Sequence, residues 1–277
     1  MTDFGDNSFL KVETGTIDQA MQAETMDRLH NGQLDAVLID GLFSKDECAR
    51  IVTTLEANVS GFEKTDFPGP FQSFFYGRNL NLDAPDLTDY FAAARRFETA
   101  LCAFSDHVGV DVQGRIASTL SGLDHGRPFV PAPGPSGESH FFTTFRGHHP
   151  GGYIPAHFDN EQSLRPSYVH VDACTRGSIL SFVVTLAEAE SGGVIELFDL
   201  CSDQAAGRIR NDDNALSRPD LGALRSQRLH VPAGGIAIVN SGRRLHRVVP
   251  VGGSRIRWTI CSFMARSRDG NRTFCWG

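Results

Sequence analysis

The sequence predicts a mostly β protein, an antiparallel double-sheet jelly roll with helices from the N-terminal part packed against it. From residue 139 onward, short β-rich runs are separated by Gly, Pro and Asn, which is typical of short strands joined by turns. Before residue 139, helical patterns dominate, and no internal repeat is visible. The expected strands span residues 139–144, 152–157, 167–171, 178–186, 194–200, 227–231, 235–240, 246–250 and 255–264.

The N-terminal part is predicted to support the sheets. A short strand, Ala36–Asp40, is followed by a helix that begins after Ser44, because Ser44 and Glu47 form the S-x-x-E pattern of a capping box. A second helix is predicted over residues 87–108. We therefore expect a single domain, 1–277, with a helical and mixed support region at 1–138, a jelly-roll core at 139–266 and a lid-like insertion at 201–225.

Composition limits the possible functions. The chain has 277 residues, and its formal net charge of −7 argues against a general nucleic-acid binder. Its apolar runs are too short to span a bilayer, and its start lacks the pattern of a signal peptide, so we expect a cytoplasmic protein without membrane contact. The six cysteines are scattered and form no C-x-x-C pair. The oligomeric state stays open, a homodimer included.

Two H-x-D patterns could carry metal chemistry, one at His157 and Asp159 and one at His170 and Asp172. On a strand, residues i and i+2 point to the same face, so the pattern brings an imidazole and a carboxylate together. One distant histidine would complete a 2-His-1-carboxylate triad, which suits non-haem Fe(II) and leaves positions open. With ten histidines, about one such pattern arises by chance, so context has to decide.

The context lies further along the chain. His246 opens one predicted strand and Arg255 opens the next, with a Gly-Gly turn between them. A hairpin through this turn would bring Arg255 back beside the strand that carries His246. A guanidinium beyond an iron site is a natural partner for the far carboxylate of a keto-diacid, because its planar fork binds carboxylate in a bidentate manner.

With these motifs the sequence resembles the Fe(II)/2-oxoglutarate-dependent dioxygenases, in particular the prolyl-4-hydroxylase-like group. The resemblance covers residues 36–58 and 139–266 and includes IDGLFSKDEC, GGYIPAHFD, SGGVIELFD, VPAGGIAIVNS and HRVVPVGGSRIR. It implies a double-stranded β-helix of the cupin-like type that uses Fe(II), 2-oxoglutarate as cosubstrate and O2. It also implies His157, Asp159 and His246 as iron ligands and Arg255 as the 2-oxoglutarate anchor.

Within the family, the sequence looks most like freestanding bacterial enzymes that act on amino acids, N-acyl amino acids or natural-product intermediates. Some of their close relatives are halogenases, which have a small residue in place of the carboxylate ligand. Because Asp159 is present, the resemblance implies hydroxylation of a small molecule with release of succinate and CO2. The alternatives are a prolyl-type protein hydroxylase, a cupin-like metal-binding protein without oxygenase activity, and a nucleic-acid demethylase, which the net charge disfavours.

Two further residues are candidates for binding the cosubstrate or substrate. Arg257 shares the predicted face of Arg255 by the period-two rule, so one of them could bind 2-oxoglutarate and the other a substrate carboxylate. Tyr153 lies four residues before His157, on the same side of the strand, and could donate a hydrogen bond to 2-oxoglutarate or be a core tyrosine.

Other candidate residues have equally plausible structural roles. Three residues that alternate on one predicted face could line the cavity or belong to the core: Phe141, Thr143 and Phe145. Arg208 and Arg210, on the insertion, could meet an anionic substrate or lie in a solvated loop. His170 is expected to support the site from a following strand, and residues 148 and 149 are expected in a turn.

Overall fold

The computed structural model describes residues 9–205 and 220–277. Its helices are α1 (Ile17–Gln22), α2 (Thr25–His30), α3 (Lys45–Ala57), α4 (Thr88–Val108), α5 (Val112–Leu123), α6 (Val169–Cys174) and α7 (Ser202–Ala205). Short 3-10 turns occur at η1 (Gly69–Phe71), η2 (Leu80–Leu82), η3 (Asp159–Leu164), η4 (Pro166–Tyr168) and η5 (Leu221–Ala223). A search of the described helices for a span of membrane length and hydropathy finds none.

Most of the remaining chain belongs to a large sheet. Its main path runs, in spatial order, β1 (Val12–Thr16), β2 (Ala36–Asp40), β12 (Ile236–Val239), β8 (Thr175–Ala187), β15 (Arg257–Ser267), β6 (Thr144–His148), β4 (Ser73–Tyr76) and β3 (Lys64–Asp66). β16 (Thr273–Trp276) pairs with β15 beyond the end of β6, and β5 (Phe129–Pro131) pairs with β16. β1 runs parallel to β2, whereas the central strands are antiparallel.

A small sheet lies against one face of the large sheet. It contains, in order, β11 (Ser226–Leu229), β10 (Ile195–Cys201), β13 (Arg244–Val248) and β7 (Ile154–His157). β9 (Ser191–Gly192) and β14 (Val251–Gly252) form a separate pair. Leu197 of the small sheet and Ala237 of the large sheet belong to one buried cluster, so these two surfaces are packed together. We call this side of the large sheet its inner face.

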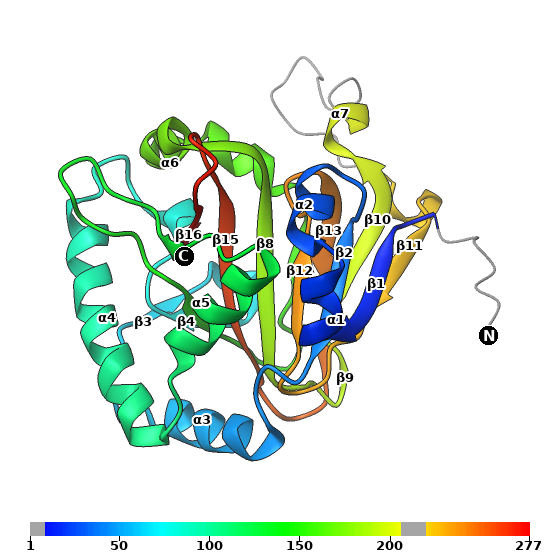
Figure 1. The fold of residues 1–277 in the computed structure, drawn as a ribbon. Helices are drawn as coiled ribbons and strands as arrows, with labels where there is room; N and C mark the ends of the chain where they lie inside the picture. The colour runs from blue at the N-terminus through cyan, green and yellow to red at the C-terminus, as the bar shows by residue number, and fades with distance from the viewer. Residues whose placement is uncertain (1–8, 206–219) are drawn as a thin grey trace.

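The opposite side, here the helix face, is covered by helices. Figure 1 shows α3, α4 and α5 on one side of β8 and β15, and β10, β11 and β13 on the other. The main core cluster combines side chains of these helices with alternate residues of the central strands. Phe145 on β6 is typical, because its ring lies 5.2 Å from that of Phe104 on α4 and 5.3 Å from that of Phe62.

The structure confirms part of the sequence-based element assignment. β2 has the predicted bounds, and Ser44 caps α3 with the predicted capping box to Glu47. The strand expected at 139–144 is displaced to Thr144–His148, and the strand expected at 167–171 is replaced by η4 and the start of α6. Pro166 begins that turn, and its fixed φ suits the first position of a helical turn. α5 was not anticipated.

Candidate metal centre

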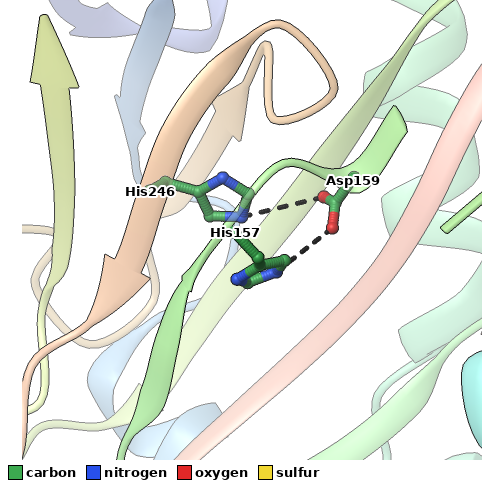
Figure 2. A group of neighbouring side chains, drawn as sticks. All are labelled: His157, Asp159 and His246. Carbon is green, nitrogen blue, oxygen red and sulfur yellow. Dashed lines mark ion pairs between the residues drawn. The ribbon is translucent and has the colours of Figure 1, made fainter. Parts of the chain in front are cut away.

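His157, Asp159 and His246 come together between neighbouring strands of the small sheet (Figure 2). β7 ends at His157, and the antiparallel pairing of β7 with β13 places His246 directly opposite it. Asp159 follows the end of β7, where its N–H donates to the Ser241 carbonyl at 3.0 Å. One ligand atom from each of the three residues lies within 4.8 Å of the others.

Both imidazoles are oriented by backbone carbonyls two residues earlier. His157 Nδ1 lies 2.8 Å from the Pro155 oxygen, and His246 Nδ1 lies 3.0 Å from the Arg244 oxygen. A carbonyl can only accept, so each Nδ1 carries a proton, and in the neutral imidazole each Nε2 presents a lone pair. The two Nε2 atoms approach the Asp159 carboxylate, at 3.2 Å for His157 and 3.8 Å for His246.

The electrostatics keep the carboxylate charged. Burial by itself raises the pKa of Asp159, but the two histidines outweigh burial and hold that pKa at about 2. Burial, reinforced by His157, lowers the pKa of His246 to about 4. Burial also opposes the charged form of His157, yet its contact with Asp159 leaves the pKa of His157 raised. The site thus offers an anionic oxygen ligand and a neutral imidazole at neutral pH.

The donor set fits a divalent cation. Both Asp159 oxygens are buried, and neither has a hydrogen-bond partner of acceptable geometry among the described residues. Leaving a buried carboxylate in this state is costly unless a cation completes it. Two imidazole nitrogens and one carboxylate are also the ligand set that suits non-haem Fe(II). Within residues 9–205 and 220–277, this is the one group of His, Cys, Asp and Glu with such geometry.

The competing H-x-D pair lies elsewhere. His170 and Asp172 are on α6, where residues i and i+2 point in different directions, so they do not form a chelate. Asp172 is exposed and His170 is partly exposed. The interpretation of His170 as a strand residue supporting the site is therefore corrected, because α6 replaces the expected strand.

The two candidate arginines lie in very different environments. Arg257 is 6% exposed and begins β15, whereas the Arg255 side chain is 78% exposed and lies 3.5 Å from Glu190. Because β15 begins only at Arg257, strand alternation does not extend back to Arg255, and the two side chains do not share a face. Burial lowers the pKa of Arg257 to about 10, and no described residue forms a hydrogen bond or ion pair with it.

The inner face carries polar groups that the sequence analysis missed. Strand register places Arg146 of β6 beside Thr259 of β15, and His148 beside Arg257. Their neighbours in sequence, such as Phe145, belong to the helix-face core, so alternation turns Arg146 and His148 inward. His148 was expected in a turn, but it ends β6, is buried, and lies 2.7 Å from the Ser73 hydroxyl through Nδ1.

The predicted cavity row lies on the other side of the sheet. Phe141 and Phe145 are fully buried in the helix-face core, where both rings contact Phe97 of α4. Thr143 is buried, and its hydroxyl donates to the Cys261 carbonyl at 2.9 Å. The structure therefore supports the core interpretation of this row. Strand alternation, applied to Arg146 and His148, would have predicted the polar side chains of the inner face from the sequence.

The remaining candidates are placed as follows. Tyr153 immediately precedes β7, is partly buried, and packs its ring edge-on against Phe71 at 5.5 Å. No hydrogen bond of its hydroxyl to a described residue is present, so its role toward 2-oxoglutarate stays a prediction. Arg208 and Arg210, with most of the predicted lid, lie outside the described residues.

Comparison with known proteins gives the family. A family model described as the carrier-protein-independent halogenase WelO5 matches residues 7–277. The chain belongs to the WelO5 family. This membership confirms the resemblance to Fe(II)/2-oxoglutarate oxygenases noted in the sequence. Among curated proteins no match is found.

Solved structures agree with this WelO5-family assignment at the level of the fold. The N-substituted L-amino acid dioxygenase from Burkholderia ambifaria has a TM-score of 0.56 and 16% identity, over 92% of this chain and 91% of that one. The same enzyme in complex with alpha-ketoglutarate has a TM-score of 0.55 and 16% identity, over 91% of each chain.

Proposed function

We propose that this WelO5-family protein is an Fe(II)- and 2-oxoglutarate-dependent dioxygenase that hydroxylates an unactivated C–H bond of a small molecule. The observation that carries the proposal is the buried Asp159 carboxylate, which lies 3.2 Å and 3.8 Å from two histidine Nε2 atoms and has no hydrogen-bond donor of acceptable geometry among the described residues. We further propose a single jelly-roll domain in which His157, Asp159 and His246 hold the iron. When bound, Fe(II) supplies, with 2-oxoglutarate and O2, the oxidation of the C–H bond and the release of succinate and CO2.

Several residues would prepare the site for this chemistry. The carbonyls of Pro155 and Arg244 fix both imidazoles before metal binds, so little reorganisation is needed. The inner-face cluster around Leu197 and Ala237 excludes water from the space between the sheets. The organic substrate is then oriented by side chains of this chain, which is the protein's share of catalysis in cofactor enzymes.

We assign the 2-oxoglutarate anchor to Arg257 in place of Arg255. Arg257 is a buried cation with which no acidic side chain of the described residues forms an ion pair, and such a charge is costly unless a ligand pairs with it. It lines a partly open cavity of about 220 Å³ together with Glu188 and Glu190, and Thr259 follows two residues later on the same face of β15. None of the three proposed iron ligands lines this cavity. We therefore propose the Arg257 side chain as the 2-oxoglutarate anchor, but we do not propose this cavity as the 2-oxoglutarate site.

Membership of a family named after a halogenase raises the question of which reaction occurs. A halogenase of this type needs an open metal position for the halide, where this chain has the Asp159 carboxylate. The carboxylate both occupies that position and repels an anion beside it. We therefore propose hydroxylation and not halogenation, with an amino acid, an N-acyl amino acid or a natural-product intermediate as substrate.

The residues after the undescribed part of the insertion pack on the outer side of the small sheet. Leu221 and Leu224 pack on a small cluster with Phe158, the residue between two of the proposed ligands. The lid-like role of the insertion at 201–225 stays a proposal, and residues 206–219 lie outside the described residues. We propose a cytoplasmic enzyme with no nucleic-acid partner.

The reaction can be tested with Asp159→Gly. A screen of free and N-acyl amino acids for substrate-dependent succinate formation would first identify a substrate. The wild-type enzyme, supplied with excess chloride, should give only hydroxylated product by mass spectrometry. Asp159→Gly should bind Fe(II) more weakly, lose most hydroxylation, and give at most a trace of chlorinated product. Chlorinated product from wild type, or undiminished hydroxylation by the glycine variant, would show that Asp159 is not a ligand.

A further inference from the structure

Arg146 is a charged side chain that the proposed mechanism does not use. Its Nε is buried without a hydrogen-bond partner, and no described residue forms an ion pair with its guanidinium. A guanidinium offers five donors and stays charged at any physiological pH, so burying part of it without acceptors is unfavourable. The arrangement becomes favourable when an anion binds.

The position of Arg146 connects it with the metal centre. It points from β6 to the inner face, beside Thr259 of β15 and Phe75 of β4. β7, which ends at His157, follows β6 after the short connection 149–153. Facing sheets lie about 10 Å apart, so Arg146 and the ligands border the same space between the two sheets.

The pKa of Arg257, lowered mainly by burial, is lowered further by the charge of Arg146, so the two guanidiniums share the inner face, but their side chains contact different neighbours. The Arg257 Cδ atom lies close to Gly193, on the side of β15 where β9 and β14 pair. The Arg146 guanidinium lies instead over the Phe67 ring, 5.3 Å from its centroid, beyond the opposite edge of β6. The two guanidiniums therefore differ in the neighbours that they contact, which is compatible with two separate anionic partners.

An aromatic row leads from Arg146 to the strand that carries His157. Phe67 contacts Phe75 at 5.1 Å and Phe71 at 6.4 Å, and Phe71 contacts Tyr153 at 5.5 Å, all edge-on. The contact with the Phe67 ring holds one side of the guanidinium and leaves N–H donors for a planar acceptor. The row offers an apolar wall to the body of a ligand whose anionic end is at Arg146.

We infer that Arg146 binds a carboxylate of the organic substrate, which makes the substrate an organic acid with an apolar body. The inference rests on the proposed function. In that function the charges of Fe(II), Asp159, the 2-oxoglutarate dianion and Arg257 sum to zero, so these groups supply no net negative charge to Arg146. A substrate with one carboxylate neutralises it, and bidentate pairing orients that substrate along the aromatic row.

The test compares acids with their amides. The probes are N-acetyl-L-phenylalanine and N-acetyl-L-leucine, each beside its primary amide. Binding is measured by calorimetry to the full chain loaded with Ni²⁺ and 2-oxoglutarate. Wild type should prefer each acid over its amide by about 10-fold or more. Arg146→Gln should abolish the preference, Arg146→Lys should keep part of it, and both should leave the 2-oxoglutarate Kd unchanged.

The matched control is Arg96→Gln, which removes an exposed arginine on α4 that pairs with Glu63 at 3.0 Å and should keep the wild-type preference. Three outcomes would overturn the inference: wild type binds neither acid, it binds acids and amides alike, or Arg146→Gln keeps the preference. A loss of 2-oxoglutarate affinity in Arg146→Gln would also overturn it, and would place Arg146 in the cosubstrate clamp. Failure of wild type to bind Ni²⁺ and 2-oxoglutarate would instead overturn the proposed function.

Discussion

The two faces of the large sheet are built from different chemistry. The helix face presents rings and aliphatic groups, such as Phe145 and Ile260, which are fully buried against the helices. The inner face presents Arg146, His148 and Arg257 from the same two strands, alternating with those apolar residues. A single pair of strands therefore serves both the hydrophobic core and the proposed binding site.

The difference shows where stability and function are located. Burial of apolar area on the helix face stabilises the fold without any ligand. The uncharged His140 ring on the helix face has a buried polar atom without a hydrogen-bond partner among the described residues, whereas between the two sheets such atoms belong to the charged groups Asp159 and Arg146 and to the His148 ring. Such groups destabilise a free protein and become favourable when ligands bind. Substitutions on the two faces should consequently have separable effects.

The largest expected effect comes from the metal ligands. His157→Ala or His246→Ala should abolish Fe(II) binding and activity and leave the circular dichroism spectrum unchanged, because the core lies on the helix face. His170→Ala, on α6, should keep both activity and metal. Metal titration and succinate formation are the measurements. If the His170 variant lost iron and the His157 variant kept it, the ligand assignment would be wrong.

Phe145→Ala tests the helix face. Removing a fully buried ring that contacts Phe62 and Phe104 should lower the free energy of unfolding by about 3–5 kcal/mol. The 2-oxoglutarate Kd of the remaining folded protein should stay as in wild type. Urea unfolding and calorimetry measure the two quantities. A large loss of 2-oxoglutarate affinity would show that the two faces are not independent.

Arg257→Ala tests the inner face, where a substitution should change the 2-oxoglutarate affinity. Truncating one partner of a buried charge pair costs about 2–5 kcal/mol, so the 2-oxoglutarate Kd should rise by about 30-fold or more. Arg255→Ala should change it by less than about 3-fold, because the exposed side chain is screened by solvent. Titration of both variants decides between them. A large effect in Arg255→Ala alone would restore the anchor predicted from the sequence.

The smallest expected effect is on the pH dependence of the free energy of unfolding, through a buried histidine on the helix face. Burial lowers the pKa of His140 to about 4, while its Nδ1 lies 2.9 Å from the Ala132 carbonyl. The unfolded chain therefore binds a proton that the folded one does not, and stability present above pH 6.5 is lost as pH falls toward 4. His140 contributes at most about 1.4 kcal/mol per pH unit.

His140→Phe should flatten this dependence over that window, measured by urea unfolding at several pH values. The ring remains between Tyr90 and Phe91, but the titrating nitrogen is gone. His107→Gln, an exposed histidine on α4, should keep the wild-type slope. An unchanged slope in His140→Phe would assign the acid sensitivity to other groups, His30 among them, whose pKa burial also lowers to about 4.

Local patterns made it possible to predict from the sequence that His157, Asp159 and His246 come together. His157 and Asp159 are near neighbours in the chain, and His246 lies in a segment whose strand–turn–strand pattern is clear. Ser44 likewise predicted the start of α3, because a capping box depends on four consecutive residues.

Features that depend on exact strand boundaries were not predictable. A strand start at Arg257 and not at Arg255 changes which arginine is buried, and sequence patterns define boundaries only to within a few residues. The displacement of β6 to Thr144–His148 likewise hid the inward position of Arg146. Its lack of a partner is a tertiary property, set by which residues β4 and β15 bring beside it.

The backbone hydrogen bonds that hold the two imidazoles have a practical consequence for redesign. Because the acceptors are the carbonyls of Pro155 and Arg244, no side-chain substitution in the surrounding pocket removes either bond. The orientation of both imidazole rings is therefore set by the strand backbone. Libraries that vary the aromatic row to accept new substrates can leave the geometry of the histidine pair intact, so the search for new specificity is separated from the preservation of the metal centre.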